Sequence, residues 1–320
     1  MKISAPATLT GLAVGNALGM PFEGCHYRDT ILESWDGESF LAGEHRNLKS
    51  GQWAAATMMA KALAASLLAH RTYAPSDAAK RYLTWYQLGE PDHRGMGKNT
   101  AKALSRLDHG LPWTQSGQQD SLGNGAAVRI APMGLLFQEN IQAAAEMSHL
   151  DAQITHKHPE AVYGSVAMSV AVCALAQGRA QPLNVINKIL GFIPEGAQLA
   201  KNLRAAQTMI LDDVSSGDKK QLLLKSGSTS KVTDTVPNAL LAFAATESYR
   251  EAVETAIRAG GDTDTVAAMT GALAGTFYGF QQVEPYFAQL ESGPELRALE
   301  CNIFNAAPPM YQVKPCPSTT

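Results

Sequence analysis

Residues 271–275 read Gly271-Ala272-Leu273-Ala274-Gly275, in the middle of the apolar segment 265–278. A similar run, Gly11-Leu12-Ala13-Val14-Gly15, lies near the start of the chain. A glycine inside a helix costs roughly 1 kcal/mol relative to alanine, and close packing of one helix backbone on another can offset this cost. The two runs therefore predict a pair of central helices that pack directly against each other.

Helical patterns also cover most of the chain between these two runs. Segments rich in Ala, Leu and Met alternate with start signals such as Pro75-Ser76. Alternating β-branched segments are nearly absent, and residues 231–236 alone are predicted to be extended. The sequence therefore predicts an all-α fold. The predicted helices cover residues 55–70, 77–88, 100–107, 126–137, 159–177, 197–211, 239–245, 249–258 and 265–278.

The length and composition indicate a globular domain with a sizeable core. The chain has 320 residues, of which 45% are hydrophobic and 17% charged, and its formal net charge is −3. We expect a single domain over residues 1–305, followed by a proline-rich tail over residues 306–320. The weakly acidic balance gives no indication of a nucleic-acid partner.

The cysteines and the apolar segments bear on the cellular compartment. Cys25, Cys173, Cys301 and Cys316 lie far apart without a C-x-x-C pair, as suits a reducing environment. The apolar N-terminus lacks the basic segment of a signal peptide. The longest apolar run, 161–176, falls short of the roughly 20 residues of a membrane span and predicts a buried helix. We therefore expect a cytoplasmic protein with no membrane partner.

The segment Gly260-Gly261-Asp262-Thr263-Asp264-Thr265 carries the strongest chemical signal. Its carboxylate and hydroxyl oxygens stand at the first turn of a helix, where they suit a hard divalent cation such as Mg²⁺. Helix capping would explain a single Asp or Thr at this place. Two aspartates around one threonine, behind a glycine turn, exceed what a cap requires. The segment therefore predicts a metal site.

Two glycine-containing loops are candidates for binding an anion. Gly123-Asn124-Gly125 stands before a predicted helix, where free N–H groups and the helix dipole favour a phosphate or diphosphate. The alternative is a simple glycine turn before a core helix. The loop 94–100 offers similar amides together with cationic side chains, and its Gly97 is a further candidate for ligand binding.

Two single residues complete the candidate site. Glu23 follows Pro21, which ends the first helix, and is therefore delivered on a loop. His156 lies at a helix entrance, where it could donate a hydrogen bond to a ligand or serve only the structure.

In this order, these segments resemble the ADP-ribosylglycohydrolase family, which includes the dinitrogenase-reductase-activating glycohydrolase and ADP-ribosylarginine hydrolases. The resemblance runs from Gly11 to about Gly279 and is carried by GGDTDT, GNALGMPFE, GNGAAVR and THKHP. It implies an all-α orthogonal bundle of helices around a cleft with two Mg²⁺ ions. It further implies metal ligands at Glu23, Asp262, Asp264 and Thr265, and ADP-ribose contacts at Gly123, Asn124, Gly125 and His156.

The chain departs from this family in one segment. Where the family has Thr-Asp-Asp-Thr after Gly-x-Trp, the chain reads Gly51-Gln52-Trp53-Ala54-Ala55-Ala56-Thr57. Three consecutive ligand positions are therefore alanine, between matching flanks. Such a confined change favours an engineered variant of a working hydrolase, and the alternative is a natural non-catalytic ADP-ribose-binding protein.

The loss of these ligands has an electrostatic consequence. An intact site would set five carboxylates against the four positive charges of two Mg²⁺ ions, whereas this chain keeps three. Three carboxylates suit one Mg²⁺ with several waters, and they compensate the repulsion between two such ions poorly. We therefore expect at most one Mg²⁺ and severely impaired hydrolysis.

The resulting function hypothesis is a Mg²⁺-dependent hydrolase fold that acts on ADP-ribose attached to a protein side chain or small molecule. An arginine linkage is the default, while serine, a nucleotide base and other acceptors stay open. Asp262 is the first candidate to accept the proton of the attacking water, and Glu23 is the alternative. The competing hypotheses are a module that binds ADP-ribose without cleaving it and a protein that keeps only the fold.

Overall fold

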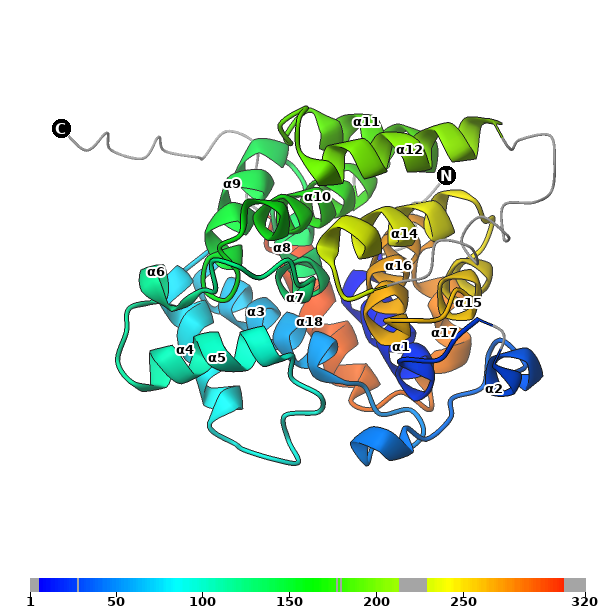
Figure 1. Cartoon of the computed structure of the whole chain (residues 1–320), viewed down its shortest axis with the longest axis horizontal. Coiled ribbons are helices and arrows are strands. Elements are labelled where there is room, and N and C mark those ends of the chain that lie inside the picture. Colours follow the sequence, from blue (N-terminus) through cyan, green and yellow to red (C-terminus); the bar gives the residue numbers. More distant parts are fainter. Residues whose placement is uncertain (1–5, 28, 177, 179, 213–228, 308–320) are drawn as a thin grey trace.

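A computed structural model of the chain describes residues 6–27, 29–176, 178, 180–212 and 229–307 (Figure 1). These residues form helices and three isolated β-bridges, with no strand among them, which confirms the all-α fold. The helices are α1 (Thr8–Gly19), η1 (Met20–Phe22), α2 (Thr30–Ser34), η2 (Glu44–Arg46), α3 (Ala55–His70), α4 (Pro75–Tyr86), α5 (Lys98–Asp108), α6 (Trp113–Ser116), α7 (Gly125–Arg129), α8 (Ala131–Leu136), α9 (Ile141–Ala152), α10 (Pro159–Ala176), α11 (Pro182–Leu190), α12 (Gln198–Asp212), α14 (Val232–Ala244), α15 (Tyr249–Arg258), α16 (Thr263–Tyr278), α17 (Phe280–Phe287) and α18 (Gly293–Asn305).

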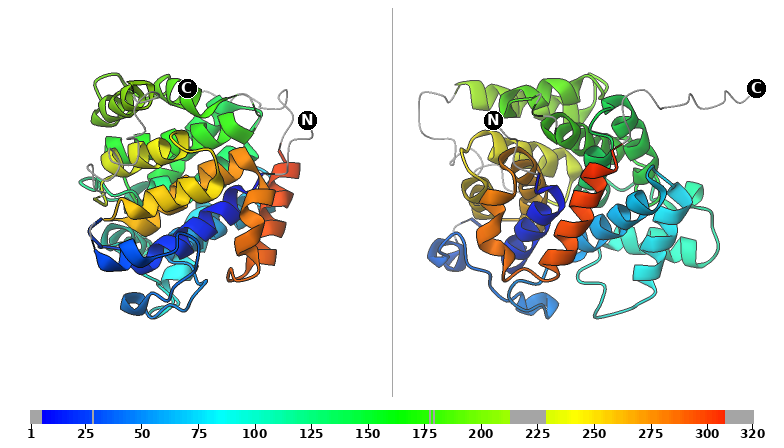
Figure 2. Two further views of the ribbon diagram at one scale, coloured as in Figure 1. Left: turned by 90° about the vertical axis from the view of Figure 1, so that its right-hand side faces the viewer. Right: turned by 180° about the vertical axis from the view of Figure 1, so that it is seen from behind.

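The predicted central pair is confirmed as α1 and α16, which lie side by side (Figure 2). A Cβ atom on Gly11 would lie 2.4 Å from the carbonyl oxygen of Gly271, and one on Gly15 would lie 2.1 Å from that of Ala267. Only glycine permits this approach of the two backbones. The pair therefore fixes Glu23, which follows α1, close to the start of α16.

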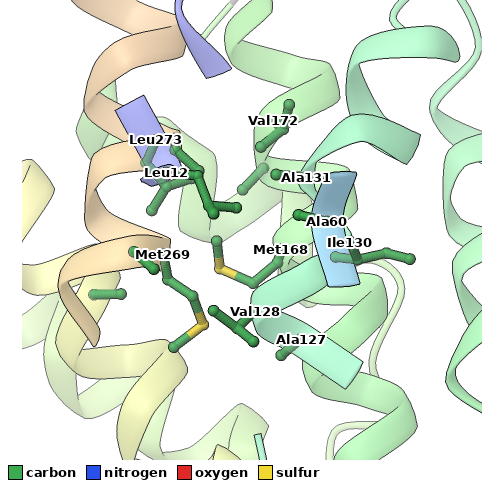
Figure 3. Packing of buried hydrophobic residues seen from close by; sticks show 14 of the residues in the cluster. Leu12, Ala60, Ala127, Val128, Ile130, Ala131, Met168, Val172, Met269 and Leu273 are labelled. Atoms are coloured by element: carbon green, nitrogen blue, oxygen red, sulfur yellow. The ribbon is translucent and has the colours of Figure 1, made fainter. Parts of the chain in front are cut away.

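One hydrophobic core runs from Ala7 to Ile303. At its centre Leu12 of α1, Val128 of α7, Met168 of α10 and Met269 of α16 pack against one another (Figure 3). Helix α10 is long and apolar enough to cross a membrane, yet 83% of its apolar window is buried inside the structure. Its apolar sequence therefore matches the interior position predicted for residues 161–176.

Two details of the prediction are wrong. Residues 231–236 were expected to be extended, but only Lys231 is, and α14 begins at Val232. The β-branched residues Val232 and Val236 stand one helical turn apart and are both fully buried, so tertiary packing overrides their strand preference. The predicted helix 126–137 is divided into α7 and α8, because Pro132 has no N–H to continue the first helix.

The chain also contains helices that were not predicted, among them α9, α11, α17 and α18. Helix α18 ends at Asn305, close to the expected end of the domain at residue 305. The predicted tail 306–320 lies outside the described residues from position 308 onward.

Candidate functional site

Four helices begin at the wall of one cavity of about 320 Å³. These are α3, α5, α7 and α16, with N-cap residues Ala54, Gly97, Asn124 and Asp262. The first N–H groups of a helix have no partner within it, so this wall is rich in donors that favour an anion. The residues that line the cavity are Glu23, Arg46, Ala55, Ala56, Met59, Gly95, Gly97, Lys98, Asn99, Thr100, Gly123, Asn124, Gly125, Val128, His156, Ser230, Asp262, Asp264 and Thr265.

Three carboxylates meet in this cavity, and we call Glu23, Asp262 and Asp264 the carboxylate cluster. One oxygen of each lies within 4.8 Å of the others. The side chain of Asp264 is buried, and its Oδ1 atom accepts no hydrogen bond. A buried carboxylate oxygen that accepts no hydrogen bond lowers stability unless it coordinates a cation. The donor set and this orphaned oxygen therefore fit a hard divalent cation.

The electrostatics of Asp264 reflect this arrangement. Burial raises the pKa of its carboxyl well above the ordinary value, and the neighbouring charges of Asp262 and Glu23 raise it further. The guanidinium of Arg46 acts in the opposite direction and lowers it. A strong shift from burial and like charges in a cavity is typical of functional sites.

Arg46 is the cationic member of the site. Its Nη2 donates a hydrogen bond to Oε2 of Glu23, and its Nη1 donates to the carbonyl oxygen of Arg94 at 3.2 Å. Burial alone would lower the pKa of this guanidinium, but the charges of Asp264, Glu23 and Asp262 leave it raised. Arg46 is therefore a permanent positive charge within the carboxylate cluster. It is absent from the sequence-based site.

The glycine loop before α7 stands beside the carboxylate cluster. The side-chain amide of Asn124 donates to Oδ2 of Asp262 at 2.7 Å, which fixes this carboxylate. A Cβ atom on Gly123 would lie 3.1 Å from Nε2 of His156, and one on Gly125 would lie 3.1 Å from its Cε1. The two glycines thus leave room over the histidine ring. The structure brings these four predicted residues together.

A buried chain of hydrogen bonds orients His156. Nη1 of Arg129 donates to the hydroxyl oxygen of Thr155 at 2.6 Å, and Nδ1 of His156 lies 2.9 Å from the same oxygen. A guanidinium only donates, so the hydroxyl of Thr155 accepts from Arg129 and can give its own proton to Nδ1, an arrangement in which the ring proton is on Nε2. Burial, followed by the charge of Arg129, lowers the pKa of His156 to about 3. The ring is therefore a neutral donor beside the glycine loop.

The three alanines occupy two different environments. Ala55 and Ala56 line the cavity in the first turn of α3. Ala54 does not, because it is fully buried against Met20 and Leu48. The remaining predicted residues Gly97 and Thr265 both line the cavity.

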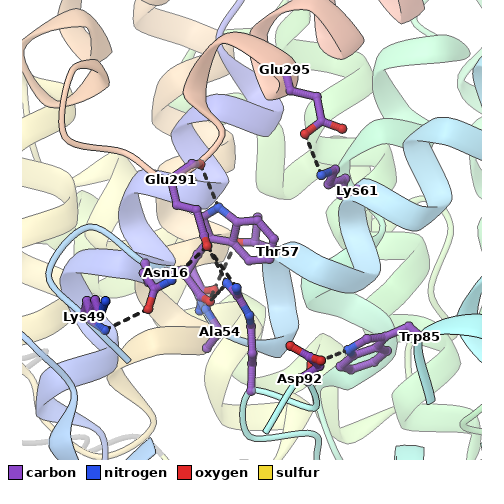
Figure 4. A network of polar contacts seen from close by, with 12 residues as sticks. Asn16, Lys49, Ala54, Thr57, Lys61, Trp85, Asp92, Glu291 and Glu295 are labelled. Carbon is purple, nitrogen blue, oxygen red and sulfur yellow. Dashed lines mark hydrogen bonds and ion pairs between the residues drawn. The ribbon is translucent and has the colours of Figure 1, made fainter. Parts of the chain in front are cut away.

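Asn16 anchors this alanine segment. Its Oδ1 accepts hydrogen bonds from the backbone N–H of Ala54 at 2.8 Å and from the hydroxyl of Thr57 at 3.0 Å (Figure 4). The start of α3 is therefore held by α1 through the backbone of Ala54 and the hydroxyl of Thr57. Asn16 was not among the site residues predicted from the sequence, although an amide in an apolar helix indicates a buried polar contact.

The comparisons with known proteins agree with this geometry. The family model for ADP-ribosylglycohydrolase matches residues 4–311. An uncharacterized protein of Archaeoglobus fulgidus is 29% identical, covering 92% of this chain and 94% of its own length. The ADP-ribosylarginine hydrolase Tri1 of Serratia proteamaculans is 26% identical (95% and 80% covered), and the human ADP-ribosylhydrolase ARH3 is also 26% identical (90% and 88%). A solved structure described as an ADP-ribosylglycohydrolase-related protein complex superposes with a TM-score of 0.74 at 26% identity, covering 94% of this chain and 97% of that chain.

Proposed function

Because the chain belongs to the ADP-ribosylglycohydrolase family, we propose that its cavity binds ADP-ribose carried by a modified protein or small molecule. We propose further that the carboxylate cluster is a Mg²⁺ site and that this chain is a severely impaired hydrolase. The observation that carries the proposal is the buried, unpartnered Oδ1 of Asp264, a residue that lines the same cavity as the starts of α5 and α7. No nucleic acid or membrane is required.

The two halves of the cavity suit the two ends of the ligand. The diphosphate is expected at Gly97 and Gly125, at the starts of α5 and α7, with Nε2 of His156 as a further donor. The N–H groups of Gly123 and Asn124 already donate to Oγ of Ser121 and to the carbonyl oxygen of Ser230. The ribose attached to the acceptor is expected at the carboxylate cluster, on the other side of Asn124. In this orientation the negative diphosphate lies at the N–H donors, and the ribose lies at the carboxylates that would hold the cation.

The reaction breaks the bond between C1″ of the ribose and the acceptor. A bound Mg²⁺ would polarise oxygens of the ribose and favour ionisation of a water molecule. The oxygen of that water would bond to C1″ as the bond from C1″ to the acceptor breaks, one proton of the water would pass to Asp262, and Asp262 would then return this proton, directly or through solvent, to the leaving acceptor. Asn124 holds the Asp262 carboxylate in place for this role, and Glu23 is the alternative base.

The alanine segment removes two of the carboxylates expected around the ion. Ala55 and Ala56 present only methyl groups to the cavity, so at most one Mg²⁺ is expected, with little hydrolysis. Replacement confined to the ligand positions favours an engineered variant. An arginine acceptor is favoured, as the name of the Tri1 relatives suggests, and we place the protein in the cytoplasm on its cysteine pattern.

A second candidate function is binding of ADP-ribose without cleavage, by a natural pseudoenzyme. It is favoured by one observation: the amide-rich loops and His156 stay assembled although the metal ligands of α3 are missing. Calorimetry with ADP-ribose is expected to show binding to the unmodified chain, weaker than to a restored one.

The decisive experiment restores the ligands by Ala54→Thr, Ala55→Asp and Ala56→Asp and measures release of ADP-ribose from an ADP-ribosylated arginine substrate in Mg²⁺. Turnover is expected to rise by several orders of magnitude. The matched control is Ala54→Thr alone, which lies outside the cavity lining and is expected to stay inactive. If the unmodified chain already turned over as fast as the restored one, the proposed impairment would be wrong.

A further inference from the structure

Arg46 stands at the tip of a short, closed loop, residues 43–48. Gly43 and Leu48 exchange two backbone hydrogen bonds, of 2.9 and 3.1 Å, which close the loop. The side chain of Leu48 packs with Met20 and Ala54 beneath the cavity. The loop is therefore anchored to the end of α1 and the start of α3, and this anchoring fixes the position of the Arg46 backbone.

The segment Arg94–Gly95 makes room for the guanidinium of Arg46. A Cβ atom on Gly95 would lie 1.1 Å from Nη1 of Arg46, so any side chain there would displace the group. Gly95 has a φ of +80°, in the region that favours glycine. The carbonyl oxygen of Arg94 accepts a hydrogen bond from the same nitrogen. The side chain of Arg46 is only 14% exposed in this seat.

We propose that Arg46 is the built-in counter-ion of the carboxylate cluster and that it competes with a divalent cation for the same carboxylates. The inference rests on the metal site proposed above. Both cations would use the carboxylate of Glu23, which Arg46 already contacts through Oε2, and two positive groups so close together repel each other. A cation that enters must therefore displace the guanidinium from Glu23.

This arrangement explains how the cluster is tolerated without metal. Three carboxylates close together in a partly dry cavity repel one another, and Arg46 supplies one compensating charge. The same charge lowers the affinity for a divalent cation. Arg46 thereby sets the concentration of divalent cation that is needed to fill the site.

The experiment uses the full chain and two variants, Arg46→Gln and the matched control Lys49→Gln. Lys49 carries the same charge next to the loop, is exposed and does not line the cavity. In EDTA, we expect a lower melting temperature for Arg46→Gln and no change for Lys49→Gln. Adding Asp264→Asn to Arg46→Gln should recover the loss. An unchanged melting temperature in Arg46→Gln would overturn the counter-ion role.

The second measurement is Mn²⁺ affinity by electron paramagnetic resonance, at one fixed pH and ionic strength. Arg46→Gln is expected to bind Mn²⁺ roughly tenfold more tightly than the unmodified chain, and Lys49→Gln equally tightly. Equal affinity in all three proteins would overturn the competition and leave the metal site standing. If neither these proteins nor the aspartate-restored chain bound Mn²⁺, the proposed metal site would fail, while the measurement in EDTA would still decide the counter-ion role.

Discussion

Burial of the Asp264 carboxyl lowers the stability of the fold, while the proposed metal site requires this carboxyl. A buried carboxylate beside two others is unfavourable for the fold, yet the same grouping is what the proposed metal site requires. Functional sites commonly contain groups that lower stability in this way.

We therefore predict opposite effects for Asp264→Asn. Mn²⁺ binding should be lost, because one of three carboxylates disappears. The free energy of unfolding in EDTA should stay equal or rise by about 1 kcal/mol, because a repelling buried group is replaced by a neutral one. Urea unfolding and a Mn²⁺ titration of the same variant check both halves. A loss of stability without metal would show that the carboxylate is needed by the fold.

His156 gives the stability of the protein a specific pH dependence. Its pKa is lowered from 6.5 to about 3 in the folded chain, which therefore keeps the ring neutral where the unfolded chain protonates it. The stabilisation is complete above the unfolded value and is lost as the pH falls from 6.5 toward 3. His156 is thus expected to make mildly acidic conditions destabilising.

This expectation is tested by urea unfolding at about pH 7 and about pH 5, where the contribution of one such histidine amounts to about 2 kcal/mol. The variant His156→Gln should lose less stability over this interval by roughly that amount. The exposed His149 serves as the control, and His149→Gln should keep the pH dependence of the unmodified chain. Identical profiles for both variants would refute the assignment.

At this scale the sequence predicted the site residues that have a local signature, and it missed those that act only in three dimensions. Asp262 and Asp264 could be found from their place between a glycine turn and an apolar helix. Arg46 lies in a loop without periodicity, and nothing in the sequence places it opposite Glu23. The separation of Ala54 from Ala55 and Ala56 likewise depends on which side of α3 faces Met20.

The same holds for the helices: those with a strong local sequence pattern were predicted, and those that depend on tertiary packing were missed or misplaced. The pair α1 and α16 was predicted because glycines in an apolar run are costly unless another backbone lies against them. Amphipathic helices such as α11 were missed, although Val185, Ile186 and Ile189 form a buried face. The division of residues 126–137 and the helical course of 232–236 were decided by Pro132 and by burial of β-branched side chains.

The contact between α1 and α16 is the element on which the site depends most directly. We predict that Gly15→Ala destabilises the protein by about 3 kcal/mol, because the new methyl group would overlap the Ala267 carbonyl. Gly196→Ala is the control, since a Cβ atom there meets no atom within 4 Å. Thermal unfolding of both variants measures the difference. Equal stability would mean that the two helices separate easily.

For the molecule as a whole, the alanine segment is expected to change the response to metal more than the fold. Asn16 holds the start of α3 through Ala54 and Thr57, both present in this chain. Restoring the two aspartates adds negative charge to a cavity that already holds three carboxylates. The restored protein should therefore depend on the cation for stability.

We predict that the restored chain melts at a lower temperature than the unmodified chain in EDTA and at a higher temperature in saturating Mg²⁺. A ligand at about one hundred times its dissociation constant contributes about 2.7 kcal/mol to the folded state. Melting curves across a Mg²⁺ series measure the crossover. Parallel curves for the two proteins would show that the aspartates do not bind the ion.

The pairing of α1 with α16 also determines how late in synthesis the folded core can form. The hydroxyl groups of Thr8 and Thr276 meet across 268 positions of sequence, and Glu23 reaches Asp264 over nearly the same span. A ribosome must therefore deliver most of the polypeptide before α1 meets α16 and before the carboxylate cluster is complete. Until then the side of α1 that packs on α16 stays exposed, and exposed apolar surface of this kind favours aggregation during folding.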